Sequence, residues 1–466
     1  MSLEVEKPDK QDDFSGCIPE VTVAVEAPKH PGLLINRNFT LLWLGQTISI
    51  IGDYVFDTTL LLWVATSISR NQPWAPLAVS GIFIMASLPV FLIGPIAGVF
   101  VDRWPKRRTM ICMDVARALL ITILLIAALS GRLPASWELG FIYAVVFITN
   151  ACSQFFNPAR LVLIGDIVAA PERARATGRL QMAVSLATIF GPVLATVLYS
   201  TVGVYIALAL NALSFVISLL AIWAIRLSFH REQREKTTQR RAFWAEFREG
   251  LAFCMHNRIL TTVIVALVVS LFGIGSVNGL AIFFVEQNLH APAGQYSILV
   301  MAIGIGTAIG AVVGGMVAQR LGLIRTLWLA LLAMSAIFFV FSRLTSFTFA
   351  VIVIFFLGFP IAAFNVALMP LVLKIVPREL VGRVAAVINP LQSLSLLFSI
   401  FVAGTLVSTV LAHFHLTFLG ITFGPVDTIY TAVAALVLIA GLYAMVNLSR
   451  ASIEAEVITS SLPDEQ

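Results

Sequence analysis

Charged side chains are scarce in this sequence. Asp, Glu, Lys and Arg make up only 12% of its 466 residues, whereas 59% are hydrophobic. Soluble domains carry about 25% charged residues, so the composition excludes an ordinary soluble protein. The formal net charge is +5, but the basic residues cluster in short stretches beside apolar runs. The topology of a membrane protein accounts for such clusters, so we expect no nucleic-acid partner. We expect an integral membrane protein whose surroundings are the lipid bilayer.

Paired cysteines and nucleotide-binding motifs are also missing. The four cysteines, Cys17, Cys112, Cys152 and Cys254, lack paired spacing and are interpreted as free thiols rather than a disulfide or zinc framework. The sequence contains no Walker loop, no Gly-rich nucleotide site and no nucleophile beside a base. We therefore expect no enzyme activity, no cofactor, no metal site and no ATP drive.

Long apolar runs dominate what is present. A membrane-spanning helix needs about 20 apolar residues, and twelve segments of the chain qualify. They predict an all-α integral membrane fold with spans near 38–66, 76–101, 110–130, 137–160, 177–200, 203–226, 259–284, 295–318, 324–342, 346–372, 384–411 and 426–448.

The distribution of Lys and Arg predicts the orientation of these spans. Basic residues are retained on the cytoplasmic side, and they concentrate in alternate loops, so both termini are expected in the cytoplasm of a cell-membrane protein. The expected organisation is a disordered tail over 1–33, a six-helix half over 34–226, a linker with an amphipathic helix over 227–258, a second half over 259–448 and a tail over 449–466.

The amphipathic helix of the linker has two possible positions. Phe243, Phe247, Leu251 and Cys254 recur at helical spacing and form one apolar face. That face either lies on the inner leaflet of the membrane or packs against the underside of the bundle.

The two halves resemble copies of each other. Asn36-Arg37 matches Asn257-Arg258, Gly98 with Asp102-Arg103 matches Gly315 with Gln319-Arg320, and Asn157 matches Asn365. Two halves related by an axis along the membrane normal place a binding site at their interface near mid-depth. The mechanism that follows from such an architecture is alternating access.

A charged hairpin at 94–108 carries a recognisable signature. Gly98, Asp102, Arg103, Arg107 and Arg108 fall between the second and third apolar runs, and this pattern resembles the loop signature of the major facilitator superfamily. Together with Trp43-Leu-Gly-Gln46, Asn157-Pro-Ala159, Val376-Pro-Arg-Glu379 and Gly382-Arg383, it is similar to the macrolide-efflux and enterobactin-exporter branch. The alternative is a basic hairpin that only anchors the topology.

Two acids of the first span are the candidates for proton coupling. Asp53 and Asp57 are four residues apart and share one helical face. Carboxylates at this depth are unfavourable unless they face water or are neutralised by a proton, a cation or a partner. They are expected to carry protons or to contact a cationic substrate; the alternative is that they cap a polar turn near the outer headgroups.

Other charges are expected to pair or to gate. Asp114 and Arg117, three residues apart, predict a structural ion pair along one helix. Arg160 is expected to close span four and to join Asp102 and the start of span eleven in a cytoplasmic charge network that breaks on inward opening. The candidate gate comprises Gly98, Asp102, Arg103, Arg107, Arg108, Arg160, Arg320, Glu379 and Arg383.

Two departures from the exporter pattern bear on coupling. Gly191-Pro192 resembles the start of the antiporter signature Gly-Pro-x-x-Gly, but Ala195 replaces its last glycine. Related exporters carry an arginine in span four, where this chain has Thr149. If that arginine tunes proton transfer, the resemblance implies that Asp53 and Asp57 replace it here.

Uncharged side chains make up the candidate substrate cavity. Its expected lining is Trp43, Gln46, Trp63, Asn150, Gln154, Gln181, Asn211, Asn278, Asn365, Asn389 and Gln392. Such walls suit a bulky amphipathic compound better than a sugar or phosphate, although the amides also serve to join helices. We expect a monomeric, proton-coupled exporter of drug-like or siderophore-like molecules. The alternatives are a solute importer and a membrane sensor or scaffold.

Overall fold

The computed structural model describes residues 35–131, 134–226, 243–377, 380–412, 414, 416–418 and 421–460. The first half contains α1 (Arg37–Trp63), extended by η1 (Val64–Ile68), then α2 (Ala75–Leu92), α3 (Gly94–Arg103), α4 (Lys106–Ser130), α5 (Ala135–Ile167), η2 (Ala170–Glu172), α6 (Arg173–Thr201) and α7 (Val204–Trp223). The second half contains α8 (Phe243–His256), α9 (Arg258–Gln287), η3 (Ala293–Gln295), α10 (Tyr296–Leu321), α11 (Leu323–Ser342), α12 (Phe347–Ile375), α13 (Val381–Ser408) and α14 (Pro425–Ser460).

Twelve helical segments in this described part are long and apolar enough to cross a membrane. This confirms the predicted all-α membrane fold. One short antiparallel hairpin, β1 (Leu416–Phe418) with β2 (Ile421–Phe423), lies before α14 and was not predicted. The predicted N-terminal tail over 1–33 lies outside the described residues.

Several helix boundaries differ from the predicted ones. The second span breaks at Ile93, because Pro95 supplies no backbone N–H to continue the helical hydrogen bonds. The charged stretch at 94–108 is therefore mostly helical, and only Trp104 and Pro105 form the turn. Helix α5 continues to Ile167, so Arg160 lies seven residues inside it instead of closing it.

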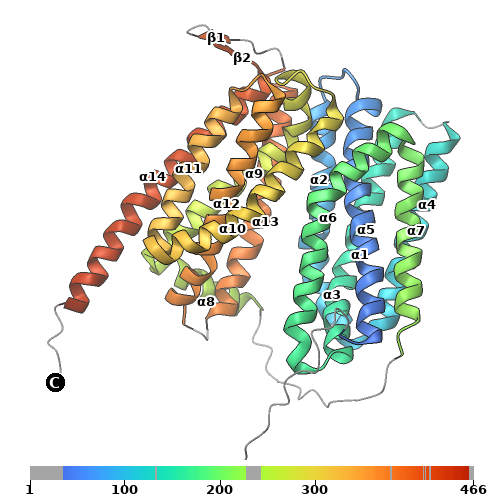
Figure 1. Ribbon diagram of the computed structural model, residues 1–466, viewed down its shortest axis with the longest axis horizontal. Helices are drawn as coiled ribbons and strands as arrows, with labels where there is room; N and C mark the ends of the chain where they lie inside the picture. Colours follow the sequence, from blue (N-terminus) through green and yellow to red (C-terminus); the bar gives the residue numbers. More distant parts are fainter. Residues whose placement is uncertain are drawn as a thin grey trace, which may run out of the picture.

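The two halves begin in the same way. Asn36 and Asn257, 221 residues apart, cap α1 and α9, and each side chain accepts a hydrogen bond from the backbone N–H three residues later, at 2.7 Å and 3.0 Å. Figure 1 shows the helices from α1 to α7 in one bundle and those from α8 to α14 in a second bundle beside it.

The bundles meet near one end of the molecule. Helix α2 contacts α13 and helix α6 contacts α10, close to the end at which α1 and α9 finish. We call this the far end, and we call the end at which α1 and α9 begin the linker end. The bundles diverge toward the linker end (Figure 1).

Small residues form the contact at the far end. The backbone N–H of Leu77 donates to Ser408 Oγ at 3.2 Å, and a Cβ atom added at Gly404 would lie 2.9 Å from Cβ of Ser80. A Cβ atom added at Gly294 would lie 2.7 Å from the methyl group of Thr196. The backbones of the two halves therefore approach closely there.

Helix α8 packs against the second bundle. Cys254 is buried in a cluster with Leu260, Val372 and Val384, and Glu249 forms an ion pair with Arg383 at the start of α13. Of the two alternatives for this helix, the described contacts favour the underside of the bundle. The side chains of Phe243 and Phe247 lie outside the described residues.

Candidate functional site

The two acids of α1 lie deep within the first span. Asp53 stands 16 residues after Arg37 and 15 before Ile68, which is about 24 Å and 22 Å along a helix. Asp53 is half-buried and Asp57 is exposed. Within the described part of the chain, neither carboxylate has an ion-pair or hydrogen-bond partner. The charges of Arg117 and Arg160 act on Asp53, and the charge of Asp53 acts on Asp57.

A chain of buried polar side chains crosses the first bundle below these acids. Arg117 donates to Asp114 at 2.7 Å, and Ser218 of α7 donates to the other oxygen of that carboxylate at 2.7 Å. Gln46 of α1 donates to Ser218 at 2.9 Å and accepts from Arg160 of α5 at 3.1 Å. Four helices are thus joined through five side chains.

Aromatic rings pack against Arg117 at one end of this hydrogen-bonded series. Its guanidinium lies 4.4 Å from the centre of the Phe156 ring and 4.6 Å from that of Phe215, an arrangement that stabilises a cation. Its Nε has no hydrogen-bond partner among the described residues. The predicted ion pair with Asp114 is present, but nothing in the local spacing pointed to Ser218.

An apolar cavity of about 290 Å³ lies in the second bundle and opens against α6. Val277, Ile303, Phe338 and Leu357 are among its apolar walls, and its polar groups are Thr188, Ser270, Asn278 and Thr307. The Thr188 hydroxyl forms a 2.7 Å hydrogen bond with the hydroxyl of Tyr54, the neighbour of Asp53 in the sequence. One hydrogen bond therefore connects the wall of the cavity with the acidic stretch of α1.

The other predicted cavity residues are dispersed. Asn278 lines the apolar cavity, whereas Trp63 and Asn211 are packed inside the first bundle. Trp43 donates to the carbonyl oxygen of Arg179 at 3.2 Å. Asn150 and Gln154 donate to backbone oxygens of their own helix. Gln181, Asn365 and Asn389 are exposed and Gln392 is half-buried.

The candidate gate residues lie near the linker end. Arg107 donates to the carbonyl oxygens of Ile222 and Trp223, which satisfies the C-terminus of α7. Gly98 lies in α3, and Arg103, Arg108 and Arg320 are exposed. Arg160 bonds to Gln46, and Arg383 bonds to Glu249. The side chain of Asp102 and the whole of Glu379 lie outside the described residues.

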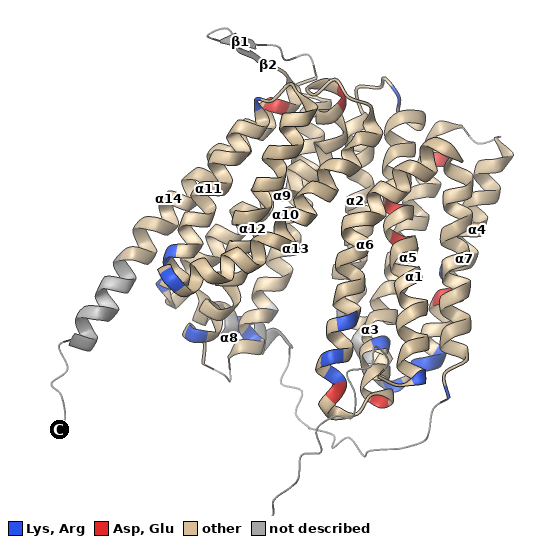
Figure 2. Ribbon diagram, in the orientation of Figure 1, with Lys and Arg blue, Asp and Glu red and all other residues tan. Residues whose placement is uncertain are grey.

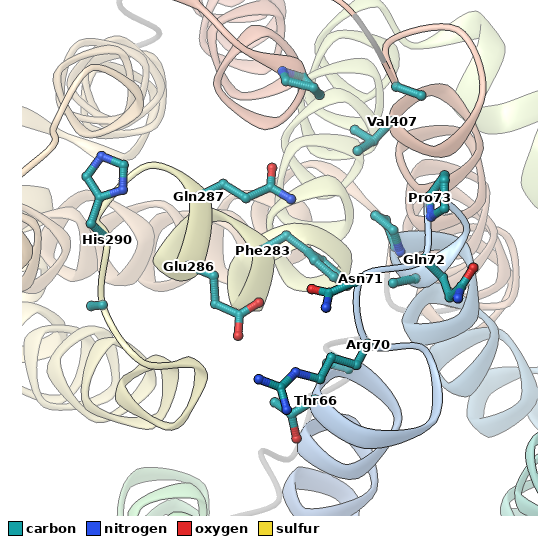
Figure 3. A pocket seen from close by; sticks show the side chains of 16 residues that line it. Thr66, Arg70, Asn71, Gln72, Pro73, Phe283, Glu286, Gln287, His290 and Val407 are labelled. Atoms are coloured by element: carbon teal, nitrogen blue, oxygen red, sulfur yellow. The ribbon is translucent and has the colours of Figure 1, made fainter. Parts of the chain in front are cut away.

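A larger cavity lies elsewhere, at the far end between the two bundles. It has a volume of about 1020 Å³ and is lined by the turn after α1, the end of α9 and the end of α13. Figure 3 shows Arg70 and Asn71 on one side of it and Glu286 and Gln287 on the other. None of its lining residues was predicted as a site residue.

Two bundles of membrane-spanning helices, with buried charges in one and an apolar cavity in the other, form the architecture of a membrane transporter. The sequence model of the Major Facilitator Superfamily matches residues 42–400, so the chain belongs to this family. Members of the family carry small molecules across membranes, which confirms the class predicted from the hairpin signature.

Two relatives are named as transporters. The uncharacterized MFS-type transporter YkuC of Bacillus subtilis is 27% identical over 376 residues, which are 78% of this chain and 84% of that protein. Macrolide efflux protein A of Streptococcus pyogenes is 23% identical over 278 residues, which are 60% of this chain and 66% of that protein.

Solved structures have the same fold. A bacterial homologue of the iron transporter ferroportin in its inward-facing state aligns with a TM-score of 0.65 and 15% identity, over 89% of this chain and 99% of that one. Its outward-facing state aligns with a TM-score of 0.52 and 16% identity, over 90% and 100%. These alignments show that the fold of this chain is the one these transporters have.

Proposed function

We propose that this transporter exports an amphipathic small molecule from the cell in exchange for protons. The observation that carries the proposal is the position of Asp53 and Asp57, whose carboxylates lie at mid-span with no partner among the described residues. They lie on the helix whose Tyr54 is hydrogen-bonded to Thr188 in the wall of the apolar cavity. Unpaired acids at this depth are unfavourable unless they bind protons or cations. The relatedness to a macrolide efflux protein supports export.

The proposed orientation puts the linker end in the cytoplasm of a cell-membrane protein. Figure 2 shows most Lys and Arg positions of the described residues at that end and few at the far end, as retention of basic residues on the cytoplasmic side requires. With the bundles joined at the far end, this arrangement is the one that receives cargo from inside. The protein is proposed to work as a monomer.

In the proposed cycle, the apolar body of the cargo enters the cavity around Asn278 while its polar or cationic part faces α1. After the linker end closes and the far end opens, a proton from outside binds the carboxylate pair of Asp53 and Asp57, both of which the step requires, and the cargo leaves. The neutral acid is more favourable in the closed apolar core than the carboxylate. Return to the inward-open arrangement releases the proton to the cytoplasm as the acid ionises again.

The test uses the full chain in vesicles with an imposed proton gradient and a panel of macrolides, dyes and siderophores. Asp57→Asn and Asp53→Asn should each abolish gradient-driven transport while cargo binding stays measurable, because an amide cannot exchange a proton. Glu172→Gln, near the linker end, is the control and should transport normally. Undiminished transport by both aspartate variants would remove these acids from the coupling role.

A further inference from the structure

The far-end cavity is lined by charged and polar side chains that have no role in the transport cycle proposed above. It lies between the two bundles and its volume of about 1020 Å³ is at the upper end of the range for small-molecule sites. The first bundle supplies Arg70, Asn71 and Gln72, and the second supplies Phe283, Glu286 and His290. Both halves contribute charged and polar groups to this space.

Two opposite charges face each other across this space. Figure 3 shows the side chains of Arg70 and Glu286 extending toward one another from the two bundles. The charge of Arg70 acts on Glu286, yet the two do not form an ion pair within 4.0 Å in the described part of the chain. Both side chains are exposed, so each remains available to a ligand placed between them.

Uncharged hydrogen-bonding groups surround the two charges. Asn71, Gln72, Gln287 and His290 line the same cavity, and Figure 3 shows them around its opening. Asn71 and His290 have φ values of 59° and 50°, and they are the non-glycine residues with positive φ among those described. They stand 219 residues apart, Asn71 after α1 and its extension η1, and His290 after α9. Residues held in this region of backbone space cluster at ligand sites.

We propose that the far-end cavity binds a small zwitterion, with Arg70 holding its carboxylate and Glu286 holding its ammonium group. Asn71, Gln287 and His290 supply hydrogen bonds to the part between the two charges, and Phe283 forms an apolar wall. Pairing of a guanidinium with a carboxylate gives geometric specificity. A molecule that bridges both bundles stabilises the arrangement in which they meet at this end, since a ligand shifts the equilibrium toward the state that it binds better. Added from the far side, the zwitterion should therefore slow turnover.

Binding is tested with the purified full chain in lipid nanodiscs, without any ion gradient. The probes are the dipeptide glycylglycine and the tripeptide triglycine, and the controls are N-acetylglycylglycine, which lacks the ammonium group, and glycylglycine amide, which lacks the carboxylate. Calorimetry should detect saturable binding of a zwitterion and a rise in unfolding temperature. Each control compound should bind at least about tenfold more weakly, a loss of about 1.4 kcal/mol.

Variants of the two charges complete the test. Arg70→Gln and Glu286→Gln should each weaken binding of the zwitterion about tenfold or more, whereas Glu138→Gln, outside the cavity at the same end, should leave it unchanged. The double variant Arg70→Glu with Glu286→Arg exchanges the charges and should bind again, because a flexible zwitterion can reverse its direction. Equal binding of all four compounds, unchanged binding by both single variants, or no binding of either zwitterion would overturn the proposal. Because the assay involves no transport, its failure is distinguishable from failure of proton-coupled export.

Discussion

At the scale of single residues, the buried charges of the first bundle depend on one another. Asp114 is fully buried and Arg117 is 4% exposed, so each needs the other: removal of one partner of a buried pair costs about 3–5 kcal/mol. Ser218 and Gln46 extend the pair to Arg160, whose charge reaches Asp53. The charges that act on the proposed coupling acid thus belong to a hydrogen-bonded network of side chains on four helices.

A substitution of Ser218 tests the importance of this hydrogen-bonded series of side chains. Ser218→Ala removes a hydrogen bond to a buried carboxylate, and bonds to charged groups contribute about 1.5–3 kcal/mol. We expect a lower unfolding temperature in detergent together with slower transport. Ser214→Ala on the same helix is the matched control, because its hydroxyl bonds within α7 to Asn211. Equal effects of the two substitutions would contradict a special role for Ser218.

Local spacing predicted part of this arrangement. The four-residue interval between Asp53 and Asp57 and the three-residue interval between Asp114 and Arg117 each predict a shared helical face, and the ion pair is present. The bonds from Ser218 to Asp114 and from Gln46 to Ser218 span 104 and 172 residues. Helical periodicity says which face a residue occupies and not which helix that face meets, so these contacts could not be predicted.

At the scale of elements, glycines on one face of α10 let it lie directly against α12. Gly306, Gly310 and Gly314 recur every four residues, and Cβ atoms added at Gly310 and Gly314 would lie 2.6 Å from Cα of Phe359 and 2.7 Å from Cα of Ala363. Lipid supplies no hydrophobic driving force between helices, so close backbone packing is what joins them. The sequence shows the small residues, but their partner helix had to come from the structure.

Gly310→Ala should therefore destabilise the protein, since the backbone of α12 must move to admit the new methyl group. Misfit of this kind costs about 1–3 kcal/mol in packed interiors. Gly315→Ala on the same helix should be tolerated, because an added Cβ there meets no atom within 4 Å. Thermal unfolding of the two purified variants measures the difference, and similar unfolding temperatures would argue against tight packing at Gly310.

The attachment of α8 can be followed through the thiol of Cys254. Burial raises the pKa of this thiol above its ordinary value, so less thiolate is present at neutral pH and labelling by a maleimide should be slow there and quicken as the pH rises. Glu249→Gln removes the exposed ion pair to Arg383, which contributes at most about 1 kcal/mol. Labelling should then accelerate about two- to fivefold.

The background for this experiment replaces Cys17, Cys112 and Cys152 with serine. Arg248→Gln, an exposed neighbour on α8, is the control and should leave the rate unchanged. If Glu249→Gln also labels at the original rate, the ion pair does not hold the helix in place.

At the scale of the whole molecule, the two bundles and their closed end are the features that matter. The twelve spans and the major facilitator fold could be predicted, because apolar length and charge asymmetry are properties of the sequence itself. Which end of the bundles is closed could not, since the same sequence must form both arrangements during alternating access. The far-end cavity was missed for a related reason: Arg70 and Glu286 are 216 residues apart and meet only through the docking of the halves.

A large side chain introduced at the far-end contact should separate the two bundles at that end. Gly404→Leu places a side chain against Ser80 and Pro76 of α2, and the structure described here cannot accommodate it. We expect a shift toward the arrangement open at the far end, measured as faster labelling of a cysteine introduced at Asn71. Gly382→Leu on the same helix, where an added Cβ meets no atom within 4 Å, should not change the labelling rate. Slow labelling in both would mean that the contact tolerates the large side chain.

The small residues at the contact between the halves affect how easily the transporter changes between its two arrangements. Serine hydroxyls, a threonine methyl group and glycine backbones make the closest approaches there, so few bulky side chains interlock between the halves. Alternating access requires that the two arrangements of the protein lie close enough in free energy to interconvert. Micromolar affinity corresponds to about 8 kcal/mol, so a difference of a fraction of that between the two arrangements is enough for one molecule of cargo to redistribute the population.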